Sequence, residues 1–138
     1  MNLKKNGNGK EYYKNGIIKF EGEYILDNRW TGNMYDFDGN IIFKMKNGEG
    51  KGKEYYIDGN LIYEGEFLNG VKHGKGKEYS NGKLKYEGEY LNGWKNGKGK
   101  EFKYNRLIFE GEYLDGKRNG KGKEYYDLKE LSQLKNTK

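Results

Sequence analysis

The chain has 138 residues, no cysteine and a formal net charge of +6, which excludes disulfide bonds and thiolate metal sites and implies only a modest positive field. Hydrophobic residues make up 33% of the chain, against roughly 45–50% in ordinary globular domains, so a large central core is not expected. Fourteen tyrosines and two tryptophans supply apolar area instead, and their regular spacing argues against disorder.

Two short motifs alternate along the chain. The first is Gly-Lys-Glu followed by an aromatic residue, as in residues 9–12, 52–55, 76–79, 99–102 and 122–125, with a diverged copy at 32–35. The second is aromatic-Glu-Gly-Glu-aromatic, at residues 20–24, 63–67, 86–90 and 109–113. The last three copies start at a constant interval, which is the mark of a repeat array.

Turn residues separate the motifs. The Asn-Gly and Asp-Gly pairs that follow the two motifs are Asn15-Gly16, Asp38-Gly39, Asp58-Gly59, Asn69-Gly70, Asn81-Gly82, Asn92-Gly93 and Asp115-Gly116. These pairs tolerate positive φ and predict tight β-hairpins. In the fourth unit Asn105-Arg106 replaces the expected pair, and we expect the turn to form there.

The motifs also have the alternation of β-strands. In residues 63–67 the two rings and Gly65 share one face, and the two glutamates share the other. An aromatic ring from a neighbouring strand can cover the bare backbone of Gly65. Lys75 and Lys77 can lie opposite Glu64 and Glu66 and so set the register.

We therefore predict an all-β fold: an elongated single-layer antiparallel sheet of tandem β-hairpins over residues 1–126, in about five to six units. The array is degenerate at 25–52, where Phe43–Gly48 lacks the Glu-Gly-Glu core, and we expect a shorter hairpin and a change of twist there. Residues 127–138 predict a short helix, since Leu128, Leu131 and Leu134 form a helical stripe. This helix would cap the last hairpin or dock a partner.

The recurring pattern Gly-Lys-Gly-Lys-Glu-Tyr-x-Asn-Gly, followed by Tyr-Glu-Gly-Glu-Tyr-Leu-Asn-Gly, resembles the MORN repeat, and more closely its variant form. The resemblance covers about residues 9–126. It implies a twisted ribbon of hairpins and a non-enzymatic role in protein scaffolding, often with self-association. It also implies acidic-phospholipid binding for some members and an antitoxin-like binding role for some bacterial relatives.

The residues themselves carry no catalytic site. His73 is the single histidine and stands where other units have asparagine, so we interpret it as a turn residue and expect no metal site and no cofactor. The pair Glu64 and Glu66 has a separation that a glycosidase could use, but it recurs in several units, whereas catalysis needs one site. Gly48–Gly52 resembles a phosphate loop but precedes a strand rather than a helix.

The aromatic stripe is the main candidate surface. Its rings either cover glycines as a one-layer core or form a half-exposed face that binds a protein, with Trp94 as an anchor. The predicted protein-binding residues are Phe20, Tyr24, Tyr63, Phe67, Tyr86, Tyr90, Trp94, Phe109 and Tyr113.

Basic residues near one type of turn are the second candidate. Stacked hairpins are expected to bring them to one edge, where they could bind the headgroups of acidic phospholipids. The residues are Lys72, His73, Lys75, Lys95, Lys98, Lys117, Arg118 and Lys121.

The expected partner is a protein, with homodimerisation through a sheet edge or end as a further possibility. Nucleic acid is disfavoured because no binding motif for it is present. The N-terminus has no signal-peptide pattern and no stretch is apolar enough to span a membrane, so we expect a cytoplasmic protein that can attach peripherally to membranes.

Overall fold

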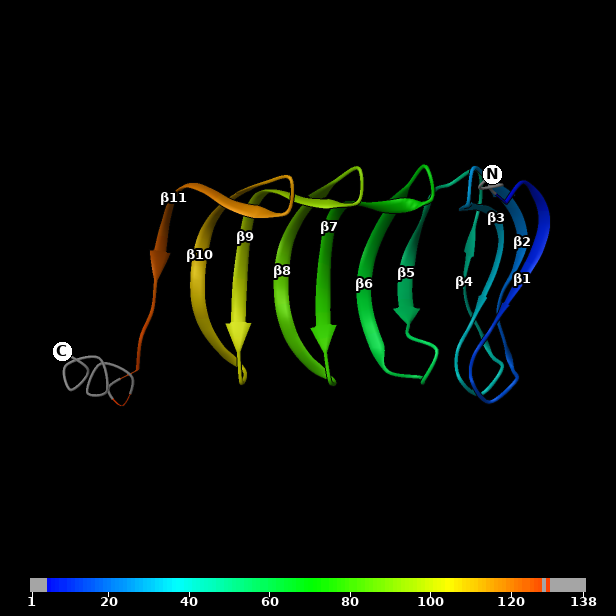
Figure 1. Ribbon diagram of the computed structural model, residues 1–138, viewed down its shortest axis with the longest axis horizontal. Helices are drawn as coiled ribbons and strands as arrows, with labels where there is room; N and C mark the ends of the chain where they lie inside the picture. Colours follow the sequence, from blue (N-terminus) through cyan, green and yellow to red (C-terminus); the bar gives the residue numbers. More distant parts are fainter. Residues whose placement is uncertain (1–4, 128, 130–138) are drawn as a thin grey trace, which may run out of the picture.

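The computed structural model describes residues 5–127 and 129, and these residues form an array of antiparallel β-strands (Figure 1). The strands are β1 (Gly7–Tyr12), β2 (Ile18–Ile25), β3 (Asn28–Tyr35), β4 (Ile41–Met45), β5 (Gly50–Tyr55), β6 (Leu61–Leu68), β7 (Val71–Ser80), β8 (Lys83–Leu91), β9 (Trp94–Lys103), β10 (Arg106–Leu114) and β11 (Lys117–Glu124). Strands that are consecutive in the chain are neighbours in each sheet. The predicted all-β antiparallel array of hairpins is confirmed.

The helix predicted for residues 127–138 depends on Leu128, Leu131 and Leu134, which lie outside the described residues.

The array divides into a four-stranded sheet, β1–β4, and a seven-stranded sheet, β5–β11. The break falls at residues 46–49, within the segment whose repeat pattern is degenerate. At five residues β4 is a short strand, as expected there. Met45 pairs with Gly32 and so occupies the position that is a glycine in the neighbouring strands. The ring of Phe43 packs against the buried clusters of both sheets and joins them across the break.

A row of glycines crosses the larger sheet, one on each strand. In the order of pairing these are Gly52, Gly65, Gly76, Gly88, Gly99, Gly111 and Gly122. The backbones approach so closely that a Cβ placed on Gly88 would lie 2.6 Å from the Cα of Gly99. Even an alanine at this position would therefore push two strands apart.

Aromatic rings cover this row on one side. A Cβ on Gly99 would lie 2.5 Å from the ring of Tyr86, and one on Gly76 would lie 2.6 Å from the ring of Tyr63. The expected covering of glycine by rings is present, but each ring lies over the glycine of the following Gly-Lys-Glu strand. The Tyr86 hydroxyl continues past the glycine and donates to the Glu89 carbonyl at 2.9 Å.

The charge register differs in part from the expected one. Lys77 lies opposite Glu64, as predicted, but Lys75 does not lie opposite Glu66. Its backbone amide donates to the Glu66 carboxylate at 2.7 Å, and its residue partner is Glu89 on the other neighbouring strand. The cause is an irregularity in the pairing after Gly65, which places His73 opposite Glu66. A bulge of this kind depends on local backbone geometry, so it cannot be predicted from the alternation of side chains along the strand.

Two-residue turns with positive φ at both positions follow the Glu-Gly-Glu strands, as at Asn69 (φ 54°) and Gly70 (φ 79°). This is the geometry expected of type I′ hairpins. In the fourth unit the prediction of an Asn105-Arg106 turn is wrong by one residue. The turn residues are Tyr104 (φ 51°) and Asn105 (φ 63°), because Arg106 already pairs with Lys103.

Successive turns along the upper edge in Figure 1 are joined by backbone hydrogen bonds. The amide of Gly93 donates to the carbonyl of Lys72, and that of Gly116 donates to Lys95, each at 2.9 Å. The same ladder crosses the break between the sheets, since Gly48 N donates to Trp30 O at 2.7 Å and Gly70 N donates to Gly48 O at 3.0 Å. The ladder of hydrogen bonds between turns therefore continues across the break between the two sheets.

The close approach of strands at the glycine row predicts that a single added methyl group strongly destabilises the fold. Gly88→Ala should lower the free energy of unfolding by about 2–3 kcal/mol, because the new Cβ meets backbone atoms that cannot turn away. Chemical denaturation followed by circular dichroism measures this change. Lys85→Ala on the same strand, with its exposed side chain, is the control and should change stability by less than about 0.5 kcal/mol. Equal stabilities for the two variants would contradict the close approach.

The strain in the Tyr104-Asn105 turn predicts that a substitution there can raise the stability of the fold. Replacing both residues by the Asn-Gly pair of the other units (Tyr104→Asn with Asn105→Gly) should raise the unfolding free energy by about 1 kcal/mol, since tyrosine is strained at positive φ. Thermal denaturation tests this expectation. The reverse change in the preceding unit, Asn81→Tyr with Gly82→Asn, should lower stability by a similar amount.

Candidate functional site

The aromatic face is the side of the sheets that carries the rings of the Glu-Gly-Glu strands. These rings meet edge to face, with centroids 5.4 Å apart for Tyr86 and Tyr90, and 5.2 Å apart for Tyr86 and Tyr113. Edge-to-face packing is the favoured arrangement for neighbouring rings. The contacts run from one repeat to the next and form the core.

The expectation of a half-exposed aromatic row is wrong, because the rings are buried. Their exposed fractions run from 0% for Tyr63 and Tyr86 to 9% for Phe67. The rings lie against bare glycine backbone and against each other, which removes them from solvent. Of the predicted protein-binding set only Trp94 is strongly exposed, at 61%.

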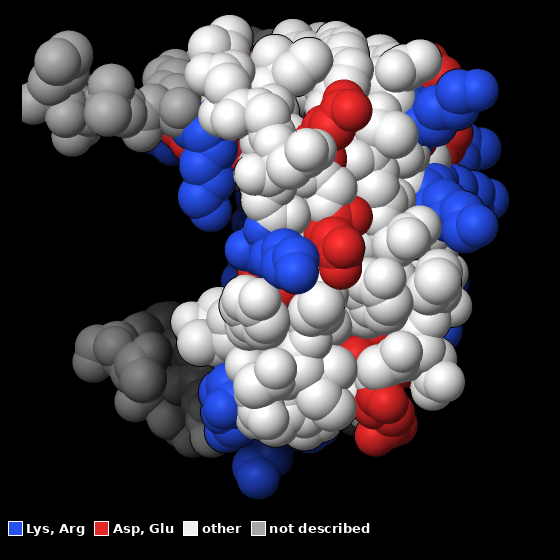
Figure 2. Space-filling model, turned by 90° about the vertical axis from the view of Figure 1, so that its right-hand side faces the viewer, with Lys and Arg blue, Asp and Glu red and all other residues white. Residues whose placement is uncertain are grey.

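Cations lie over the first ring of each of the last three Glu-Gly-Glu motifs. The ammonium of Lys95 is 4.7 Å from the centre of the Tyr86 ring, and the guanidinium of Arg118 is 4.0 Å from that of Phe109. Lys72 lies over Tyr63 at 5.0 Å. Seen from the β1–β4 end, the molecule is hollowed on one side, and Lys and Arg side chains lie at the border of the hollow (Figure 2).

The predicted basic edge is therefore wrong as a single surface. Lys72, Lys95 and Arg118 cover rings, whereas Lys75 and Lys98 line a groove on the opposite face. Residues three apart on a strand point to opposite sides, so each turn distributes its cations over both faces. Of the remaining predicted basic residues, His73 lies opposite Glu66, Lys117 opposite Leu114, and Lys121 on the exposed strand β11.

An ionic cluster joins the two sheets on the aromatic face. Arg29 of β3 contacts Glu11 of β1 at 2.6 Å and Glu54 of β5 at 2.7 Å. Burial alone would raise the pKa of Glu11, but the Arg29 hydrogen bonds and charge outweigh it and hold that pKa at about 2. Arg29 is thus a positively charged bridge across the break.

Tyrosine hydroxyls complete this layer by donating to carboxylates. Tyr90 donates to Glu78 at 2.9 Å, and Tyr113 donates to Glu101. Burial and the neighbouring Glu89 carboxylate raise the pKa of Tyr86 to about 12, and burial raises the pKa of Tyr90 further above its usual range. These hydroxyls stay protonated at neutral pH, so they serve as hydrogen-bond donors rather than as bases.

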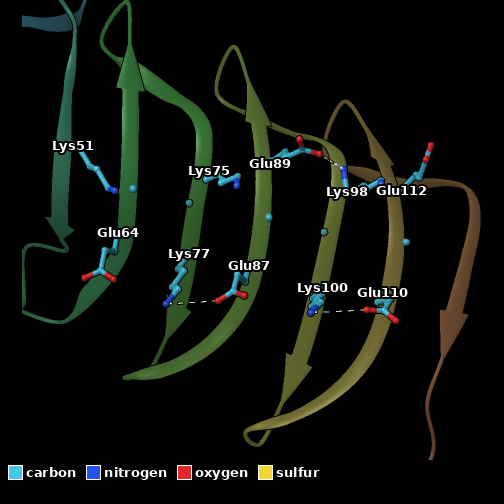
Figure 3. Close-up of a pocket in the computed structure, with 15 residues that line it drawn as sticks. Lys51, Glu64, Lys75, Lys77, Glu87, Glu89, Lys98, Lys100, Glu110 and Glu112 are labelled. Atoms are coloured by element: carbon cyan, nitrogen blue, oxygen red, sulfur yellow. Dashed lines mark hydrogen bonds and ion pairs between the residues drawn. The ribbon is translucent and has the colours of Figure 1, made fainter.

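The charged face is the opposite side of the larger sheet, and Figure 3 shows its groove. The glycine row forms the floor, and lysines and glutamates form the walls. Lys77 pairs with Glu87 at 3.6 Å and Lys100 with Glu110 at 4.0 Å. Because both signs alternate and the pairs are solvated, the face has no strong net field for binding anions.

The turn ridge is a surface that the sequence pattern indicated only through Trp94. It consists of apolar residues on either side of the stacked two-residue turns: Leu68, Val71, Leu91, Trp94 and Leu114. Leu91 and Trp94 pair across their turn and are 44% and 61% exposed, and Leu114 is 50% exposed. The Trp94 ring lies beside the next turn, since a Cβ on Gly116 would be 2.9 Å from it. The signal in the sequence is the leucine that precedes the Asn-Gly or Asp-Gly pair after each of the last three Glu-Gly-Glu motifs.

Comparison with known families agrees with this arrangement. A family model for the MORN repeat matches residues 4–18, 43–61, 63–83, 86–105 and 109–127. The chain belongs to the MORN repeat family. MORN repeats are generally linked to membrane and protein binding, and the family is not a known enzyme family. A search of curated proteins gave no match.

The family matches leave residues 19–42 uncovered between the first two repeats. In that stretch Leu26 (φ 48°) and Asp27 (φ 71°) stand where other MORN repeats have Asn-Gly, yet they form the same kind of turn. The hairpin geometry is thus retained where the sequence pattern is lost.

Within residues 5–127 and 129, no group of His, Cys, Asp and Glu side chains is arranged to hold a metal ion. The same part of the chain contains no helix long and apolar enough to cross a membrane.

The Arg29 cluster predicts a specific acid sensitivity. The pKa of Glu11 is lowered from 4.5 to about 2, so its ionisation stabilises the fold above the unfolded-state pKa. This stabilisation is lost as pH falls from about 4.5 through 2.

Wild type should lose up to about 3 kcal/mol more unfolding free energy across this window than Glu11→Gln. Urea denaturation at several pH values measures the difference. Glu21→Gln, on an exposed part of β2, should follow the wild-type profile. An unchanged profile for Glu11→Gln would contradict the assignment.

Proposed function

We propose that the chain is a non-enzymatic protein-binding module whose partner docks along the turn ridge. The observation that carries this proposal is the exposed apolar pair of Leu91 and Trp94, continued by Leu114 on the next turn. Apolar and aromatic residues within a polar surround are the usual centre of a protein interface, and tryptophan is enriched among the residues that dominate affinity.

The ridge is well suited to this role because it is held by backbone hydrogen bonds. Gly93 and Gly116 each bond to the neighbouring hairpin, so the turns that carry Leu91, Trp94 and Leu114 are fixed relative to one another. A rigid surface loses little conformational entropy when a partner binds. The ridge therefore supports a scaffolding role better than the buried aromatic face does.

Peripheral binding to acidic phospholipids is the alternative function. It has less support because Lys72, Lys95 and Arg118 lie over rings, and because Lys95 and Arg118 also pair with Glu78 and Glu101. Cations held in this way contribute less to the attraction of a lipid surface.

The double variant Leu91→Ser with Trp94→Ser should weaken binding to a partner recovered from the native cell by about thirtyfold, since it removes the centre of the interface. Titration of the purified proteins measures this loss. The control, Ile41→Ser with Tyr56→Ser, removes apolar residues of similar exposure (51% and 52%) elsewhere and should bind like wild type.

The membrane-binding alternative is tested with the same proteins. Wild type should not bind vesicles that contain acidic phospholipid more tightly than neutral vesicles. Salt-sensitive binding to the acidic vesicles, together with equal partner affinity for both variants, would overturn the proposal.

A further inference from the structure

Strand β11 is the last strand of the larger sheet, and among the described residues it pairs with β10 alone. All eight of its residues are exposed. Its outer edge presents backbone donors and acceptors that a further strand could pair with.

The interior strands of the same type show what such an edge accepts. On β7, Lys75, Gly76 and Lys77 face Glu89, Gly88 and Glu87 of the following strand. On β9, Lys98, Gly99 and Lys100 face Glu112, Gly111 and Glu110 in the same order. On β11 the equivalent residues are Lys121, Gly122 and Lys123. Because the repeats are equivalent, a strand added beside β11 should carry Glu, Gly and Glu opposite these three residues.

The ring layer adds a second requirement. The ring of Tyr90 packs on Tyr63 of the preceding unit, at 5.4 Å, and its hydroxyl donates to Glu78. Tyr113 repeats this arrangement with Tyr86 and Glu101.

For a strand after β11 the corresponding groups are Phe109 and Glu124. The Glu124 carboxylate accepts hydrogen bonds from Arg118 and Tyr126, so an incoming tyrosine hydroxyl would take the place of Tyr126. A tyrosine after the second glutamate thus completes the pattern.

We propose that the outer edge of β11 binds an extended segment of another protein, with the pattern aromatic-Glu-Gly-Glu-Tyr, as an added antiparallel strand. Main-chain hydrogen bonds supply affinity, and the side chains supply selection. Lys121 and Lys123 select the two glutamates, and the close approach at Gly122 selects glycine between them.

Other occupants fit less well. A second copy of this chain would have to release a Glu-Gly-Glu strand, and β2, β6, β8 and β10 each have neighbours on both sides. The outer strand at the other end, β1, has Asn8 where β11 has Lys121, so it lacks one of the two selecting charges. The site is also separate from the turn ridge, so the two proposals stand or fall independently.

The test uses the full chain and a synthetic peptide with the sequence of residues 83–91, which contains Tyr-Glu-Gly-Glu-Tyr. Fluorescence anisotropy of the labelled peptide should show saturable binding, and a scrambled peptide should not bind. The variant Lys121→Glu with Lys123→Glu should weaken binding by about tenfold or more, because two favourable cross-strand pairs become repulsive. The control Lys83→Glu with Lys85→Glu makes the same charge change on the internal strand β8 and should bind like wild type.

A charge exchange makes the test specific. A peptide with lysine in place of both glutamates should bind the Lys121→Glu, Lys123→Glu variant better than it binds wild type. A peptide with alanine in place of its glycine should bind neither. Absence of saturable binding, equal binding by the scrambled peptide, or binding unaffected by the charge reversal on β11 would each overturn the proposal.

Discussion

The contact between an aromatic ring and the bare backbone of a neighbouring glycine is the interaction on which this fold depends. A single-layer sheet has no second layer of structure to cover it, so it must exclude water with its own side chains. The ring of Tyr86 does this by lying across Gly99 and donating its hydroxyl to the Glu89 carbonyl beyond. Ring and glycine depend on each other, because any side chain on Gly99 would displace the ring and an uncovered glycine would leave backbone exposed.

This packing also accounts for where the cations lie. A buried ring keeps an electron-rich face, and Lys95 and Arg118 lie over the rings of Tyr86 and Phe109 while pairing with glutamates of preceding strands. The same side chains thus cover apolar surface and satisfy carboxylates. A net charge of +6 is consequently a poor guide to anion binding here, since much of the positive charge belongs to the packing.

The sequence was sufficient for the architecture because each local signal agreed with the others. Alternation, turn residues and a constant repeat length all indicated antiparallel hairpins, and the interrupted unit at Phe43–Gly48 coincided with the break between the sheets. The face that each residue occupies was harder to predict. Lys72 and Lys75 looked like one cluster because they are close in sequence, and the alternation that separates them was not applied to the turns.

Other misses arose from geometry that no pattern encodes. The bulge after Gly65 places His73 rather than Lys75 opposite Glu66, and the Tyr104-Asn105 turn begins one residue before the expected pair. The aromatic stripe was correctly located, but the choice between a one-layer core and a half-exposed binding face stayed open, because the pattern does not show how deeply a ring is buried. The rings form the core. The leucines beside the turns, such as Leu91 and Leu114, give no local sign of exposure, because leucine is usually a core residue.

The ladder of turn hydrogen bonds has a consequence for the growth of such chains. Each link joins one hairpin only to the next, as Gly93 joins Lys72 and Gly116 joins Lys95. A tandem duplication of one hairpin would therefore insert a new rung without disturbing any existing one. Array length can change in whole steps during evolution, and each added hairpin brings its own contacts with its neighbours.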